Sequence, residues 1–262
     1  MTYLDLVQSG ILHGLVAVLP VGSMALVEWV GNLAGDPVAR ALIDALAIFG
    51  ILPALFILLR HELGMLGMGV VRLARRRFDG TVRLLGLVLL AALPYLAVDL
   101  SGFKILILPM LVSCAIAAAV GIWFLLSDRL GVTVRDMHHL SAVNFLTIGV
   151  VQAGLAMVGI PALLVSIAVA RLLGCERDQA AKLGLLLVIP HLVFVACSAM
   201  GMVPAAMRLP PMMDAVLIVG ASFTSALLAT SLMLAWVSRQ NFLPFALFQV
   251  AGGIAFAVML AF

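Results

Sequence analysis

Charged side chains are scarce in this chain. Of its 262 residues only 10% are Asp, Glu, Lys or Arg, while 65% are hydrophobic, and the mean hydropathy is +1.27. A soluble domain carries about 25% charged residues. So few charges cannot cover a surface that faces water on all sides, which excludes a soluble globular domain. We therefore expect a lipid environment and no nucleic-acid partner.

Cysteine is also rare, and no metal-binding spacing occurs. Cys114, Cys175 and Cys197 lie in or beside apolar runs, so we interpret them as small apolar side chains and expect neither a metal site nor a cofactor. A cleavable signal peptide is not expected either, because the first ten residues hold Asp5 but no Lys or Arg.

Long apolar runs make up most of the chain. A spanning helix needs about 20 apolar residues. Six runs meet this need, at 41–59, 84–100, 105–127, 183–203, 214–237 and 242–262. Glycine and proline interrupt two further apolar stretches, 6–30 and 144–170. The pattern predicts an all-α, polytopic integral membrane protein with a single membrane domain over residues 1–262.

The basic residues predict how the chain crosses the membrane. If both interrupted stretches enter and leave on one side, 12 of the 15 Lys and Arg residues fall in loops on the cytoplasmic side. If both cross the membrane, the linker 171–182 moves outside with three basic residues. The distribution favours six spanning helices plus two re-entrant helical hairpins, with both termini outside. Two Pro-kinked spanning helices are the alternative.

Two matching segments indicate an internal repeat. The segment GILH at Gly10–His13 matches GVVQ at Gly149–Gln152, and LAGD at Leu33–Asp36 matches LLGC at Leu172–Cys175, both at an offset of 139 residues. Under the predicted topology the halves have opposite orientation. We therefore expect an inverted-topology repeat, about 6–127 and 144–262, with a site near the bilayer midplane.

Three segments carry a resemblance to a known family. GILHGLVAVLPVGSMAL (10–26) resembles the motif G-x-x-E-G-x-T-E-F-L-P-V-S-S-x-G-H, GVVQAGLAMVGIPALLVSIAVARLLGCERDQAAKLGLLLVIP (149–190) resembles a second region that contains P-G-x-S-R-S-G, and NFLPFALFQVAGG (241–253) resembles a closing helix. The chain thus resembles the undecaprenyl pyrophosphate phosphatases of the bacitracin-resistance type. The resemblance implies a bacterial inner-membrane location and removal of the terminal phosphate from an isoprenoid pyrophosphate.

The chain departs from these motifs at the residues that carry the family's chemistry. His13 and Ala17 stand at the two motif glutamates, Ala162 stands at the motif arginine, and Gln249 replaces an arginine usual in the last helix. Splitting a pyrophosphate requires cations or fixed donors on the developing charge and a positioned acid or base. This loss predicts a non-catalytic relative that binds an isoprenoid or similar amphipathic lipid and moves it or presents it to other enzymes.

Two other functions remain open at this point. One is an active undecaprenyl-diphosphate phosphatase with a rearranged site that uses His13, Ser23 and Glu28. The other is a structural membrane subunit without a ligand. The expected partner is a membrane lipid, with a polyprenyl phosphate as one candidate, and self-association is left open.

The ligand-binding candidates are polar residues in apolar surroundings: His13, Ser23, Gln152, Ser166 and His191. Each also has a structural interpretation. His13 and Gln152 are repeat-related and can satisfy each other across the hairpin tips, Ser23 can cap a helix, and His191 follows Pro190 and can bind a freed carbonyl.

Two carboxylates near the same region have structural interpretations as well. Glu28 lies close to the expected outer interface, where a carboxylate can be solvated. Asp44 follows Arg40 by four residues, which predicts an interfacial ion pair within one helix.

Overall fold

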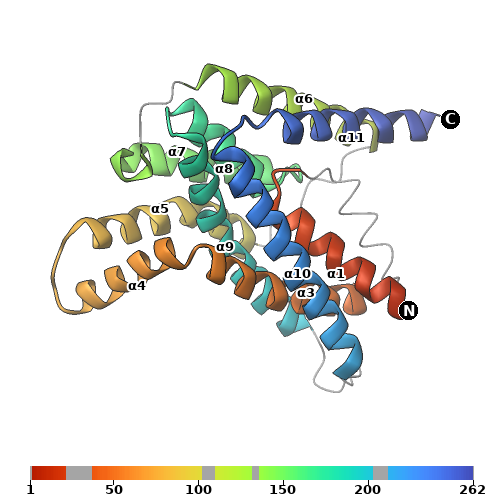
Figure 1. The fold of residues 1–262 in the computed structure, drawn as a ribbon, viewed down its shortest axis with the longest axis horizontal. Helices are drawn as coiled ribbons and strands as arrows, with labels where there is room; N and C mark the ends of the chain where they lie inside the picture. Colours follow the sequence, from red (N-terminus) through yellow and green to blue (C-terminus); the bar gives the residue numbers. More distant parts are fainter. Residues whose placement is uncertain (1, 22–36, 102–109, 132–135, 203–211, 262) are drawn as a thin grey trace.

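The chain folds into helices throughout the part that the structure describes. The computed structural model describes residues 2–21, 37–101, 110–131, 136–202 and 212–261 (Figure 1). The elements are α1 (Tyr3–Val18), α3 (Pro37–Leu58), α4 (Arg60–Ala74), α5 (Gly80–Leu100), α6 (Met110–Leu130), the short 3-10 helix η1 (Met137–His139), α7 (Ala142–Ala156), α8 (Ala162–Leu172), α9 (Arg177–Met202), α10 (Met212–Val237) and α11 (Leu243–Ala261). The predicted all-α class is confirmed.

Each of the six predicted spans corresponds to one long helix. Within the described residues, α3, α5, α6, α9 and α10 are long and apolar enough to cross a membrane. Their outward faces expose large apolar side chains, among them Phe49, Leu93 and Leu232, which suit contact with lipid tails. The chain is therefore a multi-pass membrane protein. The crossing of α11 stays a prediction.

The predicted interruption of 144–170 is present. The helix α7 ends at Ala156, and Gly159 has a positive φ of 76°, a conformation that glycine adopts without a steric penalty. Pro161 then precedes α8. At about 1.5 Å per residue, α7 and α8 are roughly 22 Å and 16 Å long, so neither spans a hydrocarbon layer of about 30 Å alone.

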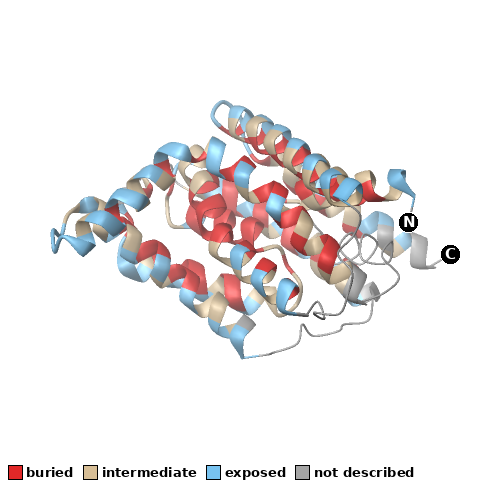
Figure 2. Ribbon diagram, turned by 90° about the horizontal axis from the view of Figure 1, so that it is seen from below, coloured by how far each residue is buried: buried red, intermediate tan, exposed pale blue. Residues whose placement is uncertain are grey.

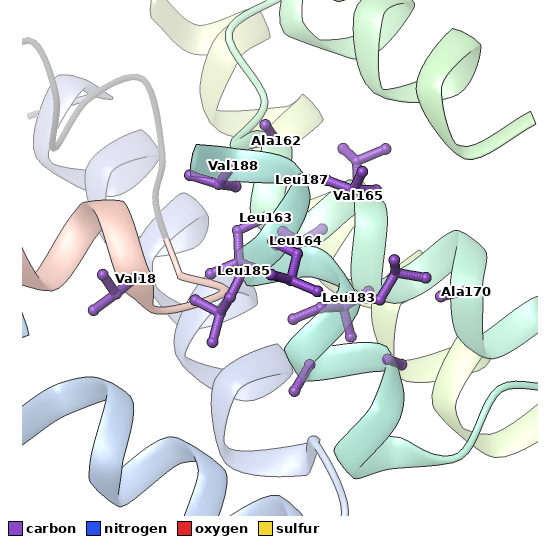
Figure 3. Packing of buried hydrophobic residues seen from close by; sticks show 14 of the residues in the cluster. Val18, Ala162, Leu163, Leu164, Val165, Ala170, Leu183, Leu185, Leu187 and Val188 are labelled. Atoms are coloured by element: carbon purple, nitrogen blue, oxygen red, sulfur yellow. The ribbon is translucent and has the colours of Figure 1, made fainter. Parts of the chain in front are cut away.

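The helix α8 forms the centre of the fold. Every residue from Ala162 to Arg171 is buried, as expected for a helix that is apolar on all sides and enclosed by protein. Figure 2 shows buried residues gathered in the middle of the molecule and exposed ones around it. Leu163 and Leu164 of α8 pack with Leu185 of α9, and Val18 at the end of α1 belongs to the same buried cluster (Figure 3).

A buried arginine ties the loops at one end of the bundle. The charge distribution places Arg171 in a loop on the cytoplasmic side, but the residue is 0% exposed. Its Nε donates to Asp128 Oδ1 at 3.0 Å, its Nη2 donates to the carbonyl oxygens of Asp128 and Gly131 at 3.0 Å each, and its Nη1 donates to that of Cys175. Arg177 Nε donates to Asp128 Oδ1 at 2.8 Å. The guanidinium thus links the ends of α6 and α8 to the start of α9.

Glycines allow the short helices to approach the spanning helices closely. A Cβ at Gly10 would lie 2.8 Å from the carbonyl oxygen of Ile218 in α10, and one at Gly14 would lie 2.6 Å from that of Ser222. In the second half, a Cβ at Gly149 would overlap the carbonyl group of Ala91 in α5. The backbone contact between α7 and α5 therefore requires glycine at position 149.

We expect Gly149→Ala to lower the melting temperature of the detergent-solubilised protein, because the methyl group forces α7 away from α5. Overpacking of this kind costs about 1–3 kcal/mol. Gly154→Ala is the matched control in the same helix, since no heavy atom lies within 4 Å of its added Cβ. Equal melting temperatures for the two variants would contradict the close contact.

The substitution Arg171→Ala should strongly lower the melting temperature of the protein. Arg171→Ala leaves the buried Asp128 carboxylate with less compensation, and breaking a buried ion pair costs about 3–5 kcal/mol. Arg177→Ala should cost less, because the Arg177 side chain is 36% exposed. Thermal unfolding of both variants measures the difference in stability. A larger drop in melting temperature for Arg177→Ala than for Arg171→Ala would refute the assignment of Arg171 as the main partner of Asp128.

Candidate functional site

A polar cavity lies between α1, α3 and α9. It measures about 270 Å³ and is lined by His13, Arg40, Asp44 and His191 together with apolar residues. A larger groove of about 880 Å³ lies between α1, α10 and α11, but no titratable side chain of the described residues lines it. Of these two, only the smaller is lined by charged side chains, and we call it the head-group chamber. A further cavity of about 350 Å³ between α4 and α5 is lined by Arg72, Asp79 and Arg83, but there Arg72 pairs with Asp79.

His13 is held between a backbone carbonyl and a carboxylate. Its Nδ1 lies 2.8 Å from the carbonyl oxygen of Ser9, one helical turn earlier, and its Nε2 lies 2.7 Å from Asp44 Oδ1. A carbonyl oxygen only accepts, so Nδ1 is the donor to Ser9. The contact between Nε2 and the carboxylate oxygen has the length of a hydrogen bond. The His13–Asp44 pair at the wall of the chamber is therefore placed to share a proton.

Arg40 lies one helical turn before Asp44 and lines the same chamber. The predicted ion pair between Arg40 and Asp44 is wrong, because within the described residues the carboxylate pairs with His13 instead. Asp44 faces α1, so the imidazole of His13 lies closer to its carboxylate than the guanidinium of Arg40 does. Within the described residues Arg40 forms no ion pair, so its guanidinium can contact a ligand in the chamber.

His191 also lines the head-group chamber and contacts a tyrosine outside it. Its Nε2 lies 3.3 Å from the hydroxyl oxygen of Tyr95, and the two rings meet edge to face with centroids 4.3 Å apart. Tyr95 comes from α5 and His191 from α9. Sequence reasoning missed Tyr95, although a tyrosine within an apolar helix signals a need for a hydroxyl partner.

A second cavity adjoins the first. It measures about 260 Å³ and shares four lining residues with the head-group chamber, Val16, Ala17, His191 and Leu192. The rest of its wall comes from Tyr95, Val188 and the turn between α7 and α8. We call it the turn chamber. Together the two have the volume of a small-molecule site, about 300–1,000 Å³.

The other predicted ligand residues have different roles or lie elsewhere. Ser166 Oγ lies 2.8 Å from Gln152 Oε1, and both side chains are buried between α7 and α8. The predicted pair of His13 and Gln152 is therefore not formed, since each is satisfied by a nearer partner. Ser23 and Glu28 lie outside the described residues, and their roles stay predictions.

The segment that stands at the family's arginine motif is packed with apolar side chains. Leu163 and Leu164 are 2% and 0% exposed, and Ala162 is buried with them (Figure 3). No charged group of the described residues lines the turn chamber beside this segment apart from the titratable pair of Tyr95 and His191. The charged side chains nearest to it in the adjoining chamber come from α1 and α3 instead.

Comparison with known proteins identifies the family. A family model described as bacitracin resistance protein BacA matches residues 6–255. The chain belongs to this family. It is 30% identical to undecaprenyl-diphosphatase 1 of Paramagnetospirillum magneticum, over 97% of this chain and 96% of the relative, and 31% identical to undecaprenyl-diphosphatase 1 of Rhodospirillum rubrum, over 97% and 94%. The undecaprenyl-diphosphatase of Maricaulis maris is 28% identical over 98% of this chain and 99% of the relative.

These relatives contradict the prediction of a non-catalytic lipid carrier. BacA-family proteins that match the chain from end to end carry the name of an enzyme, which favours the active alternative. The prediction treated the lost motif residues as a lost site. It did not foresee that Arg40, Asp44 and His13 line one cavity.

Proposed function

We propose that this BacA-family member is an active phosphatase that removes the terminal phosphate of a polyprenyl diphosphate such as undecaprenyl diphosphate. The observation that carries the proposal is the proton-sharing His13–Asp44 pair beside Arg40 in the head-group chamber. The names of the relatives support the substrate class. The chamber supplies a fixed cation and a transferable proton, which phosphoryl transfer requires.

The reaction can be written with the residues of the chamber. A water oxygen attacks the terminal phosphorus, and the bond from that phosphorus to the bridging oxygen breaks. The Arg40 guanidinium stabilises the charge on the phosphoryl oxygens, which it can bind in a bidentate manner. The His13–Asp44 pair gives its proton to the bridging oxygen and takes one back from the attacking water. The products are the lipid monophosphate and inorganic phosphate.

The proposed topology places the enzyme in the bacterial inner membrane, with the α7–α8 hairpin re-entrant from the cytoplasmic side. Contacts at both ends of the hairpin support this. Arg83 Nη2 donates to the carbonyl oxygen of Leu140 just before α7, and Arg171 at the end of α8 binds Asp128. Both partners adjoin predicted cytoplasmic loops. The two termini lie at the end of the molecule away from the basic turn between α4 and α5 (Figures 1 and 2), which supports termini on the outer side.

The packing of the short helices supports the proposed inverted repeat over about 6–127 and 144–262. The helix α1 of the first half packs on α10 of the second, while α7 of the second half packs on α5 of the first. Gly10 and Gly149, 139 residues apart, each contact a carbonyl group of the partner helix. An exchange of equivalent helices between halves is what a two-fold repeat produces.

Removing the shared proton should abolish turnover. We expect His13→Ala and Asp44→Asn each to lower kcat for farnesyl diphosphate by about 10²-fold or more, because general acid–base catalysis contributes 10²–10⁴-fold. Phosphate release by the purified protein measures this. The control His61→Ala removes an exposed histidine of α4 and should leave kcat unchanged. Wild-type rates in both His13 and Asp44 variants would disprove the assignment.

Arg40→Ala should lower kcat/KM for the same substrate by about 10²–10³-fold, the usual effect of losing one charge-stabilising donor. Arg40→Lys should recover part of the loss, since it keeps the charge but not the planar fork. Arg239→Ala, which removes an exposed arginine between α10 and α11, serves as the matched control. An Arg40→Ala variant as active as the control would place the phosphate elsewhere.

A further inference from the structure

The turn chamber differs in chemistry from the head-group chamber that it adjoins. Its wall is made of aliphatic side chains, glycine and proline, and its two polar groups, Tyr95 and His191, bond to each other at the side that faces the head group. Arg40, Asp44 and His13 line only the neighbouring chamber. A phosphate in the turn chamber would lie beside apolar groups without a fixed cation, which is unfavourable.

An alkyl chain suits this chamber for the same reason. An alkyl chain that enters the chamber is removed from water or from the lipid head-group region. Where it leaves water, the free energy gained is roughly 25 cal/mol per Å² of apolar surface buried. Val16, Ala17, His191 and Leu192 line both chambers, which therefore adjoin. A molecule whose charged end lies in one chamber can reach the other with its apolar chain by passing these four side chains.

We infer that the turn chamber binds the first isoprenyl units of the substrate while the head-group chamber holds its diphosphate. This inference rests on the proposed function and adds where the lipid chain lies. His191 marks the boundary between the two parts of the ligand. The turn between α7 and α8, with Gly159 and Pro161, then acts as the part of the wall that contacts the chain next to the diphosphate.

The larger apolar groove is a poorer place for these units. It is lined by Val7, Ile11 and Leu15, which lie on one face of α1, whereas Leu12, His13 and Val16 of the other face line the chambers. The groove shares no lining residue with either chamber in the described part of the chain. The body of α1 thus separates the groove from the diphosphate, and the groove faces lipid.

Filling the turn chamber tests the inference. Ala156 lines it at the end of α7, so Ala156→Phe places a ring where the chain would lie. We expect the KM for farnesyl diphosphate to rise about tenfold or more, as for a blocked apolar subsite. The KM for ethyl diphosphate, which has no chain to place there, should not change. Val150→Phe is the matched control, since Val150 is an exposed residue of the same helix.

The outcomes separate this inference from the proposed function. A KM for farnesyl diphosphate in Ala156→Phe within about twofold of the Val150→Phe value would overturn the inference while phosphatase activity stands. If the wild type releases no phosphate from either substrate, the proposed function fails. In that case equilibrium binding of a dansyl-labelled farnesyl phosphate decides the inference, which requires binding about tenfold weaker in Ala156→Phe than in Val150→Phe.

Discussion

The ion pair of Arg171 and Asp128 is the interaction on which the rest of the described fold depends. The arginine is buried, and its donors reach a carboxylate and three carbonyl oxygens from the ends of α6 and α8. Asp128 Oδ2 also accepts from the backbone N–H of Phe242 at 3.1 Å, which joins the start of α11 to the same point. A buried charge is tolerated only with such complete pairing. This pairing fixes one end of α8, and α8 in turn forms the wall of the turn chamber.

The site itself depends on how α1 is placed. Gly10 and Gly14 let one face of α1 lie against α10, so that the opposite face, with His13 and Val16, turns toward α3 and α9. Asp44 of α3 then contacts His13 of α1. The same glycines that serve packing therefore determine which side chains line the head-group chamber, and a shift of α1 would separate the shared proton from Arg40.

The sequence allowed the helices and their interruption to be predicted, because apolar length and the Gly159–Pro161 break are local features. It did not allow the partner of Asp44 to be predicted. Within one helix Arg40 is the nearest charge, and only the packing of α1 on α3 brings His13 to 2.7 Å. For the same reason the charge distribution places Arg171 in a loop without indicating its burial, since its partner Asp128 lies 43 residues away in the chain.

The misjudged activity has a similar physical cause. A sequence motif compares side chains position by position. Phosphoryl transfer instead requires a cation, a transferable proton and a cavity that excludes bulk water, whichever helix supplies them. In this BacA-family member Ala162, Leu163 and Leu164 make the hairpin turn apolar, and the charged groups lie on α1 and α3. Arg40 places a positive charge in the chamber beside the His13–Asp44 pair. Under the proposed function this charge attracts the diphosphate, while the apolar turn cannot compensate its desolvation, and the two together orient an amphipathic substrate in one direction.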